Sequence, residues 1–208
     1  MNSATQTQSR PVRTQSRRAT STWPILMAAA SVGLIFLGVG FQDLGSHDRL
    51  LLINRYLARL SFLFFIPIYA AAPLAIWRPG AATRGLIRIR RSLGLGYALV
   101  MATHLGAILA YQQTTGSEPL DLPTLLGGGL GFAFIAALAL TSNDLSIRKM
   151  GGRAWKRLHR TALHWLWVIY ALTYSGRVSE DGFEYLPALV TVFLLLGLRL
   201  SVRFQRAA

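Results

Sequence analysis

Residues 23–41 read WPILMAAASVGLIFLGVGF, nineteen residues without a charged side chain. As a helix, a run of this length crosses about 30 Å of hydrocarbon, because each residue rises about 1.5 Å. Backbone polar groups in lipid must find partners within their own segment, so such runs are expected to be helical. The sequence therefore predicts an all-α membrane protein, a bundle of six transmembrane helices. The five further apolar segments are 60–77, 92–111, 122–141, 154–175 and 183–202.

The charged residues sort to opposite sides of this bundle. With the N-terminus in the cytoplasm, 18 of the 22 Lys and Arg residues fall in inner segments and seven of the eight Asp and Glu residues in outer ones. Because Lys and Arg bias sets orientation, both termini are predicted to be cytoplasmic. Residues 1–21 are predicted to be a disordered basic tail and residues 22–203 a single membrane domain.

The composition excludes several function classes. The net charge is +14, yet 52% of the residues are apolar. The basic residues lie between apolar segments rather than on one face of a soluble domain, so we expect membrane lipid, not nucleic acid, as their partner. The chain has no cysteine, which excludes disulfides, thiolate-bound iron–sulfur clusters and c-type haem attachment.

Histidines inside the apolar segments are the main candidates for chemistry, because an ionisable residue in a span is costly. His104 lies roughly 20 Å beyond Arg91 along the third segment. His164 lies a turn or more into the fifth segment, and His159 lies at its inner edge. His47 falls in the first outer loop, where we expect it to be solvated.

Neutral imidazole in a membrane has several uses, and spacing alone leaves them open. Haem iron takes one histidine from each of two helices. Zinc needs three or four ligands, and proton relays pair histidine with carboxylates, which the spans lack. A histidine hydrogen-bonded to a neighbouring helix is the structural alternative.

Four motifs carry a resemblance to a known family. The stretches RRSLGL at 90–95, ATHL at 102–105, LALTS at 138–142 and GGRAWKRLHR at 151–160 resemble the ferric reductase-like transmembrane family. Within it, the chain is most similar to the MsrQ/YedZ branch, the haem-binding membrane subunits of the periplasmic methionine sulfoxide reductase system. This resemblance implies a multi-pass protein of the bacterial cytoplasmic (inner) membrane. It also implies an electron-transfer subunit that carries electrons across the bilayer to a partner reductase outside.

The resemblance also implies a ligand set. His104 corresponds to the family's outer-level haem ligand on the third helix, and His159 to the inner-level ligand on the fifth. Arg90 stands where the third helix of the family has its inner-level site. A guanidinium cannot bind iron, so Arg90, with Arg91 beside it, is expected to hold a haem propionate.

The sequence departs from the family pattern at the outer level. Leu172 stands where the family has its second outer ligand, and Arg55 where the second helix has an additional histidine. His164 lies about 7.5 Å beyond His159, too low to face His104 across one haem. Three outcomes remain open: an outer haem that is five-coordinate or bound by Tyr174, an inner haem on His159 with or without His164, or no haem.

The expected cofactor is one haem b, with a second less well supported by the residues. The chain ends six residues after Val202, so we expect no flavin or nicotinamide domain of its own. Electrons would come from quinol or from a separate flavoprotein, with quinone or flavin as the donor cofactor. The alternative is a haem-free membrane scaffold or accessory subunit that keeps the fold.

Two local patterns predict packing and capping. Gly127 and Gly131 fit the small-xxx-small rule, which predicts close packing of the fourth helix against a neighbour. Ser142 and Asn143 precede the basic stretch 144–150 and are expected to cap a short helix on the inner surface.

Overall fold

The computed structural model describes residues 21–116, 122–180 and 182–207. The predicted tail, apart from Ser21, lies outside the described residues. Within the described part every regular element is a helix, as the apolar pattern predicts. The elements are α1 (Trp23–Gly40), α2 (Ser46–Trp77), α3 (Ala81–Thr115), α4 (Leu122–Thr141), α5 (Asp144–Met150), α6 (Gly152–Glu180), the 3₁₀ turn η1 (Phe183–Tyr185) and α7 (Leu186–Ala207).

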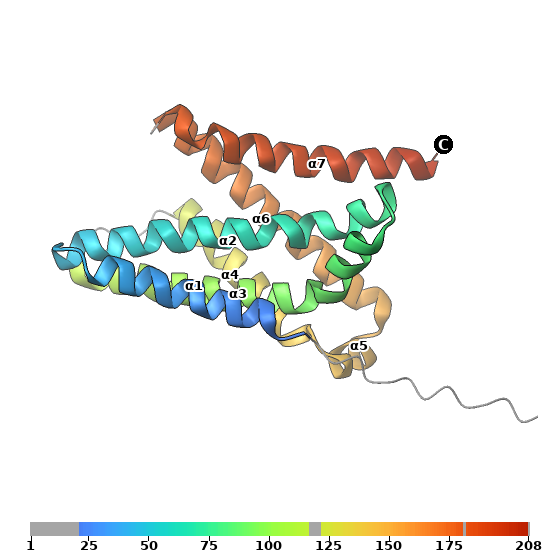
Figure 1. Ribbon diagram of the computed structural model, residues 1–208, viewed down its shortest axis with the longest axis horizontal. Helices are drawn as coiled ribbons and strands as arrows, with labels where there is room; N and C mark the ends of the chain where they lie inside the picture. Colours follow the sequence, from blue (N-terminus) through green and yellow to red (C-terminus); the bar gives the residue numbers. More distant parts are fainter. Residues whose placement is uncertain (1–20, 117–121, 181, 208) are drawn as a thin grey trace, which may run out of the picture.

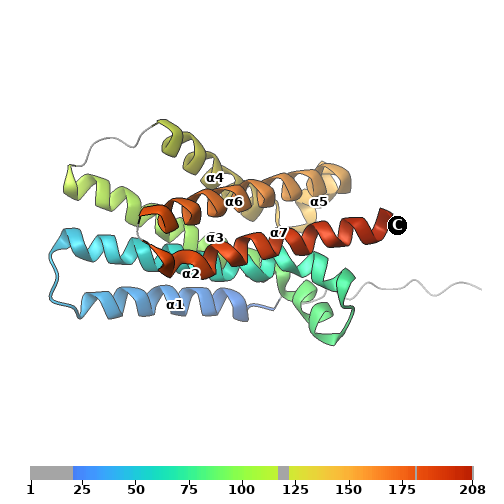
Figure 2. The same cartoon turned by 90° about the horizontal axis from the view of Figure 1, so that it is seen from above.

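The long helices form one bundle (Figures 1 and 2). The longest two, α2 and α3, pack against each other, and α1 packs on both. Helix α4 contacts α3 and α6, while α7 contacts α2 and α6. The start of α1, the short α5 and the end of α7 lie toward one end of the bundle, and the turn between α1 and α2 lies at the other (Figures 1 and 2).

Five helices of the described chain are long and apolar enough to cross a membrane, which supports a multi-pass membrane protein. Their outer surfaces are apolar: Leu34, Leu140 and Leu194 are 68%, 76% and 67% exposed. Lipid is a suitable environment for such side chains, whereas water is not. Helix α6 is not among the five, although its length of 29 residues suffices. Because histidine, tryptophan and tyrosine side chains lower its hydropathy, the sixth span stays a prediction.

Two helices extend well beyond the apolar segments that predicted them. Helix α2 begins at Ser46 rather than near residue 60, and α3 begins at Ala81 rather than near residue 92. Hydropathy detects only the part of a helix that is apolar all round. The added part of α2 is amphipathic, with Ile53 and Leu57 buried inward. Arg55 and Arg59, which lie before the predicted apolar segment 60–77, are therefore part of the helix.

The loop between α4 and α6 confirms one predicted cap. The side chain of Asn143 accepts a hydrogen bond of 2.7 Å from the backbone N–H of Ser146, at the start of α5. Ser142 does not cap α5, because its hydroxyl donates instead to the carbonyl of Leu138 at 2.6 Å.

Glycines lie at two helix crossings. A Cβ on Gly127 would lie 3.7 Å from Ile169 of α6, and one on Gly131 would lie 3.9 Å from Leu166. Helix α4 therefore packs on α6, but these are ordinary contact distances, and the predicted close approach through glycine stays a prediction. A tighter crossing was not predicted: a Cβ on Gly96 of α3 would lie 3.0 Å from the Pro24 carbonyl oxygen of α1.

Candidate functional site

Two half-open cavities lie within the described part of the bundle. The inner cavity, of about 850 Å³, lies between α2, α3, α4, α6 and α7 near the end that holds α5. The outer cavity, of about 660 Å³, lies between α2, α3, α4 and α6 farther along the bundle. Volumes of this size are typical of sites for small molecules and cofactors. Tyr97, Ile135 and Leu166 line both cavities and form the wall between them.

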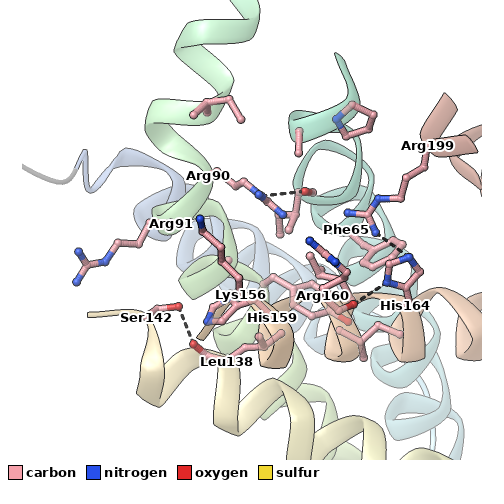
Figure 3. A pocket seen from close by; sticks show the side chains of 18 of the residues that line it. Phe65, Arg90, Arg91, Leu138, Ser142, Lys156, His159, Arg160, His164 and Arg199 are labelled. Carbon is pink, nitrogen blue, oxygen red and sulfur yellow. Dashed lines mark hydrogen bonds between the residues drawn. The ribbon is translucent and has the colours of Figure 1, made fainter. Parts of the chain in front are cut away.

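The inner cavity brings together four of the five residues that the sequence analysis had marked for cofactor binding (Figure 3). Arg90 and Arg91 reach it from α3, and His159 and His164 reach it from α6. Three more cations line it that the sequence analysis did not single out: Lys156, Arg160 and Arg199. No Asp or Glu is among the described residues of its lining, so the cavity carries a strong excess of positive charge.

Both ring nitrogens of His164 are engaged. Nδ1 lies 2.6 Å from the carbonyl oxygen of Arg160, one turn earlier on α6. A carbonyl only accepts, so Nδ1 carries the proton and Nε2 keeps its lone pair. The Arg199 guanidinium donates to Nε2 at 3.3 Å (Figure 3). It also lies over the Tyr69 ring, 4.2 Å from the ring centroid.

His159 is held by α4 and by its own helix. Its Nε2 lies 3.3 Å from the Thr141 hydroxyl oxygen. Thr141 uses its one proton on the Ala137 carbonyl at 2.6 Å, so Nε2 of His159 must be the donor. The Trp155 ring lies 4.0 Å from the imidazole, centroid to centroid. In this arrangement Nδ1, rather than Nε2, is the nitrogen of His159 with a free lone pair.

The two arginines of α3 have different surroundings. Arg90 is half-buried, and its Nε donates to the Ile68 carbonyl of α2 at 3.2 Å (Figure 3). Its terminal nitrogens remain available to the cavity. Arg91 is exposed and pairs with Asp144 of α5 at 3.3 Å. Arg90 is therefore better placed than Arg91 to hold an anionic group inside the cavity.

The outer cavity contains His104 and no other histidine. Among the described residues the imidazole makes no hydrogen bond, and its Nδ1 is buried without a partner. Its one ring contact is with Phe132 of α4, at 6.5 Å between centroids. Since Nδ1 is sealed off, Nε2 is the nitrogen that can reach the cavity. Nε2 has no hydrogen bond among the described residues, so its lone pair is available to a bound ligand.

Other polar groups of the outer cavity were only partly foreseen. Arg55 and Arg59 of α2 and Arg177 of α6 line it, again without an acidic residue among the described lining. Their charge had been assigned to topology alone. Asn54, which the sequence analysis did not single out, places Nδ2 on the Ala107 carbonyl at 3.1 Å and leaves Oδ1 buried without a partner. A polar residue in an otherwise apolar turn of α2 was the signal that could have identified it.

The two levels predicted from the sequence are physically separate. His104 and His164 lie in different cavities, so they do not face each other across one site. Leu172 and Tyr174 line the outer cavity, on the α6 side. In the wall, Tyr97 and Tyr170 place their hydroxyl oxygens 3.3 Å apart, and Tyr170 lies 2.8 Å from Ser61.

Known proteins similar to this chain identify its family. Over 179 residues the chain is 30% identical to the protein-methionine-sulfoxide reductase heme-binding subunit MsrQ of Klebsiella pneumoniae subsp. pneumoniae, covering 74% of this chain and 87% of that protein. The chain belongs to the MsrQ family. Its membership confirms the resemblance drawn from the motifs of α3, α4 and α6.

Further relatives are consistent with membership of this family. The MsrQ of Klebsiella pneumoniae strain 342 is 31% identical over 156 residues, which are 64% of this chain and 76% of that protein. The magnetosome protein MamZ of Magnetospirillum gryphiswaldense is 30% identical over 149 residues, or 69% of this chain. The chain spans only 22% of the length of MamZ, so the match concerns one part of that larger protein. No protein-family model and no solved structure matches the chain.

The side chains favour a cofactor over a bare metal ion. No cluster of three or more His, Cys, Asp or Glu residues occurs in the described part of the chain. A site for a bare divalent cation needs several such ligands. Haem needs only one or two axial ligands, because its porphyrin supplies the other four. A lone imidazole in an apolar cavity with arginines near it meets that smaller requirement.

Proposed function

We propose that this MsrQ-family protein binds haem b in the outer cavity through His104 and carries electrons across the membrane. The observation that carries the proposal is the unpartnered imidazole of His104 in a cavity rich in arginine. Its relatives of the MsrQ name are heme-binding subunits, which supports haem binding by this chain. Bound haem would supply one-electron chemistry, in which iron alternates between the ferric and ferrous states.

The residues around His104 are suited to hold a haem. Nε2 of His104 is available as an axial ligand, and Phe132 beside it offers an apolar wall. Arg55, Arg59 and Arg177 supply positive charge for the two propionates, which guanidinium groups bind well. The role of these residues is to fix the ring, offset its charge and keep water from the apolar part of the cavity.

The inner cavity is assigned to electron entry. Five cations, of which only Arg91 pairs with an acidic residue in the described part of the chain, suit an anionic donor, such as the phosphate of a flavin nucleotide delivered by a flavoprotein. The apolar part suits a quinol. A second haem there would have to bind His159 through Nδ1, because its Nε2 is bonded to Thr141, or displace Arg199 from Nε2 of His164. The acceptor would be a partner reductase on the outer side, as in the system for which MsrQ is named.

The topology follows from charge. We place six spans in the bacterial inner membrane, with α6 crossing among the other helices and both termini in the cytoplasm. The start of α1, α5 and the end of α7 lie toward one end of the bundle, which supports a common cytoplasmic side (Figures 1 and 2). Reporter fusions at Gln113, Asp144 and Ala208 should read outside, inside and inside. A cytoplasmic signal at Gln113 would contradict this orientation.

Purification in detergent tests the function. The protein, expressed with added haem precursor, should carry a Soret band and a reduced-minus-oxidised spectrum of b type. A well-folded, monodisperse preparation without a Soret band would contradict the proposal. That result would support the haem-free scaffold, which the missing second histidine in the outer cavity makes the natural alternative.

A further inference from the structure

The outer cavity offers iron a ligand from one side only. His104 is its single histidine, and the chain contains no cysteine. The other side chains of the described lining that can bind haem iron are one methionine and four tyrosines. They are Met101, Tyr97, Tyr170, Tyr174 and Tyr185.

Met101 cannot serve as the opposite ligand. It precedes His104 by three residues on α3, so both side chains project from the same face of the same helix. Two axial ligands must approach iron from opposite sides of the porphyrin plane. Met101 therefore lies on the side that His104 already occupies.

The tyrosines are held elsewhere. Tyr97 and Tyr170 belong to the hydroxyl chain that ends on Ser61. Tyr185 lies 3.4 Å from a guanidinium nitrogen of Arg59, which donates to its hydroxyl. Tyr174 packs on the Phe62 ring at 4.8 Å and stacks on Tyr170 at an interplanar angle of 15°. A tyrosine binds iron after losing its proton, and a phenol packed among aromatic rings is poorly placed to do so.

Apart from its two tyrosines, the α6 side of the cavity offers no good ligand for haem iron. Leu166, Ile169 and Leu172 carry no donor atom, and the other residues that line it from α6 are Thr173 and the cationic Arg177. Leu172 is also 66% exposed, so the cavity is open beside it. In a membrane that opening faces lipid, where small neutral molecules dissolve readily and charged ones do not.

We propose that haem iron held by His104 keeps its second axial position open and binds small diatomic ligands of the carbon monoxide, nitric oxide and dioxygen class. This inference rests on the proposed haem site. It distinguishes the protein from an electron carrier with two histidine ligands, whose iron is closed to such molecules. The residues responsible are the lone His104 and the α6 side of the cavity, where Leu172 lies at the edge and offers no ligand.

Carbon monoxide is the probe, applied to the full-length, haem-loaded protein in detergent. The dithionite-reduced wild type should show a high-spin spectrum, and the gas should shift its Soret band to the sharp form of a six-coordinate adduct. Leu172→His should place an imidazole at the open side. We expect a low-spin spectrum before the gas is added and about tenfold or greater weakening of its binding. Leu172→Gln, of similar size but without an iron ligand, is the matched control and should behave as wild type.

Each result of this experiment either supports or overturns the open axial position. A wild-type protein that contains haem but is low-spin and indifferent to carbon monoxide overturns this inference and leaves the haem site standing. If Tyr174→Phe then gains carbon monoxide binding, Tyr174 is the second ligand. A carbon monoxide adduct that survives His104→Ala but is lost in His164→Ala places the open iron in the inner cavity and also overturns the inference. A folded protein with no Soret band overturns the proposed function along with it.

Discussion

The inner and outer cavities differ in how far the protein itself satisfies their histidines. In the inner cavity His164 uses both ring nitrogens, on Arg160 and Arg199, and His159 bonds Thr141. In the outer cavity His104 has no hydrogen bond among the described residues. The inner cavity nevertheless has more histidines, more cations and a larger volume.

The number of histidines in a cavity is therefore a poor guide to whether it binds a cofactor. A histidine that is bonded on all sides is already stable in the empty protein. His104, in contrast, has an Nε2 that no described protein group uses, so this nitrogen is available to a ligand. By this criterion the outer cavity, with a single histidine, is the stronger candidate for haem, and the inner cavity is the stronger candidate for a mobile anionic donor.

The largest expected effect is on haem content. His104→Ala should remove most of the haem, because the outer cavity has no second histidine to retain it. His159→Ala and His164→Ala should each keep most of it. Haem-to-protein stoichiometry, measured by pyridine haemochrome on preparations that pass gel filtration, checks this ranking. Full haem retention in His104→Ala with loss in His164→Ala would reverse the assignment of the two cavities.

In the haem-free protein, substitution of His164 should cost more stability than substitution of His104, the reverse of their order for haem content. His104→Leu removes an unsatisfied buried nitrogen, so its free energy of unfolding should be unchanged or raised, by up to about 1 kcal/mol. His164→Leu takes the acceptor from Arg199 and should lower it by about 1 kcal/mol. Reversible unfolding in mixed micelles gives both values. Equal losses in the two variants would show that the hydrogen bonds do not distinguish the cavities.

A smaller effect is expected from the charges of the outer cavity. Arg59→Gln removes one candidate propionate partner, and because Arg59 is exposed we expect only a several-fold loss of haem affinity. Arg88→Gln on α3 is the control, since Arg88 is exposed and lines neither cavity. Titration of the haem-free variants with haem measures the two affinities. An effect of the same size in the two variants would mean that only the overall charge matters.

The smallest effect should come from Thr141→Val. The hydrogen bond from His159 is long, at 3.3 Å. Its loss should cost about 0.5 kcal/mol or less in the free energy of unfolding, and the haem content should not change. Loss of haem comparable to that in His104→Ala would instead tie the haem to His159 and to the inner cavity.

Much of the fold was predictable, because the requirements of lipid on a helix are simple. The apolar segment at 23–41 gave the limits of α1 to within one residue, and that at 122–141 matches α4. The extensions of α2 and α3 were not predicted. In the extension of α2, window hydropathy averages the buried Ile53 and Leu57 with exposed arginines. In that of α3 it averages the partly buried Leu86 and Ile89 with exposed arginines. Helix α6 shows the opposite difficulty, since polar side chains directed into cavities make it less apolar than a span in contact with lipid.

The site was predictable by residue type but not by arrangement. The rule that ionisable residues in spans are functional selected His104 and His164 directly. The sequence could not show that one of them is bonded on both nitrogens and the other on neither. Arg199 illustrates the reason, because it reaches His164 from α7, 35 residues away along the chain. Contacts of that kind depend on how helices pack, and helical periodicity carries no information about them.

The position of the iron is the most direct test of the account. Crystals of the haem-loaded protein, measured at the iron absorption edge, should give an anomalous peak within bonding distance of Nε2 of His104, between α3 and α6. The α6 side of that peak should face Leu172, with no protein ligand. A peak beside His159 or His164, with none beside His104, would contradict the assignment of haem to the outer cavity.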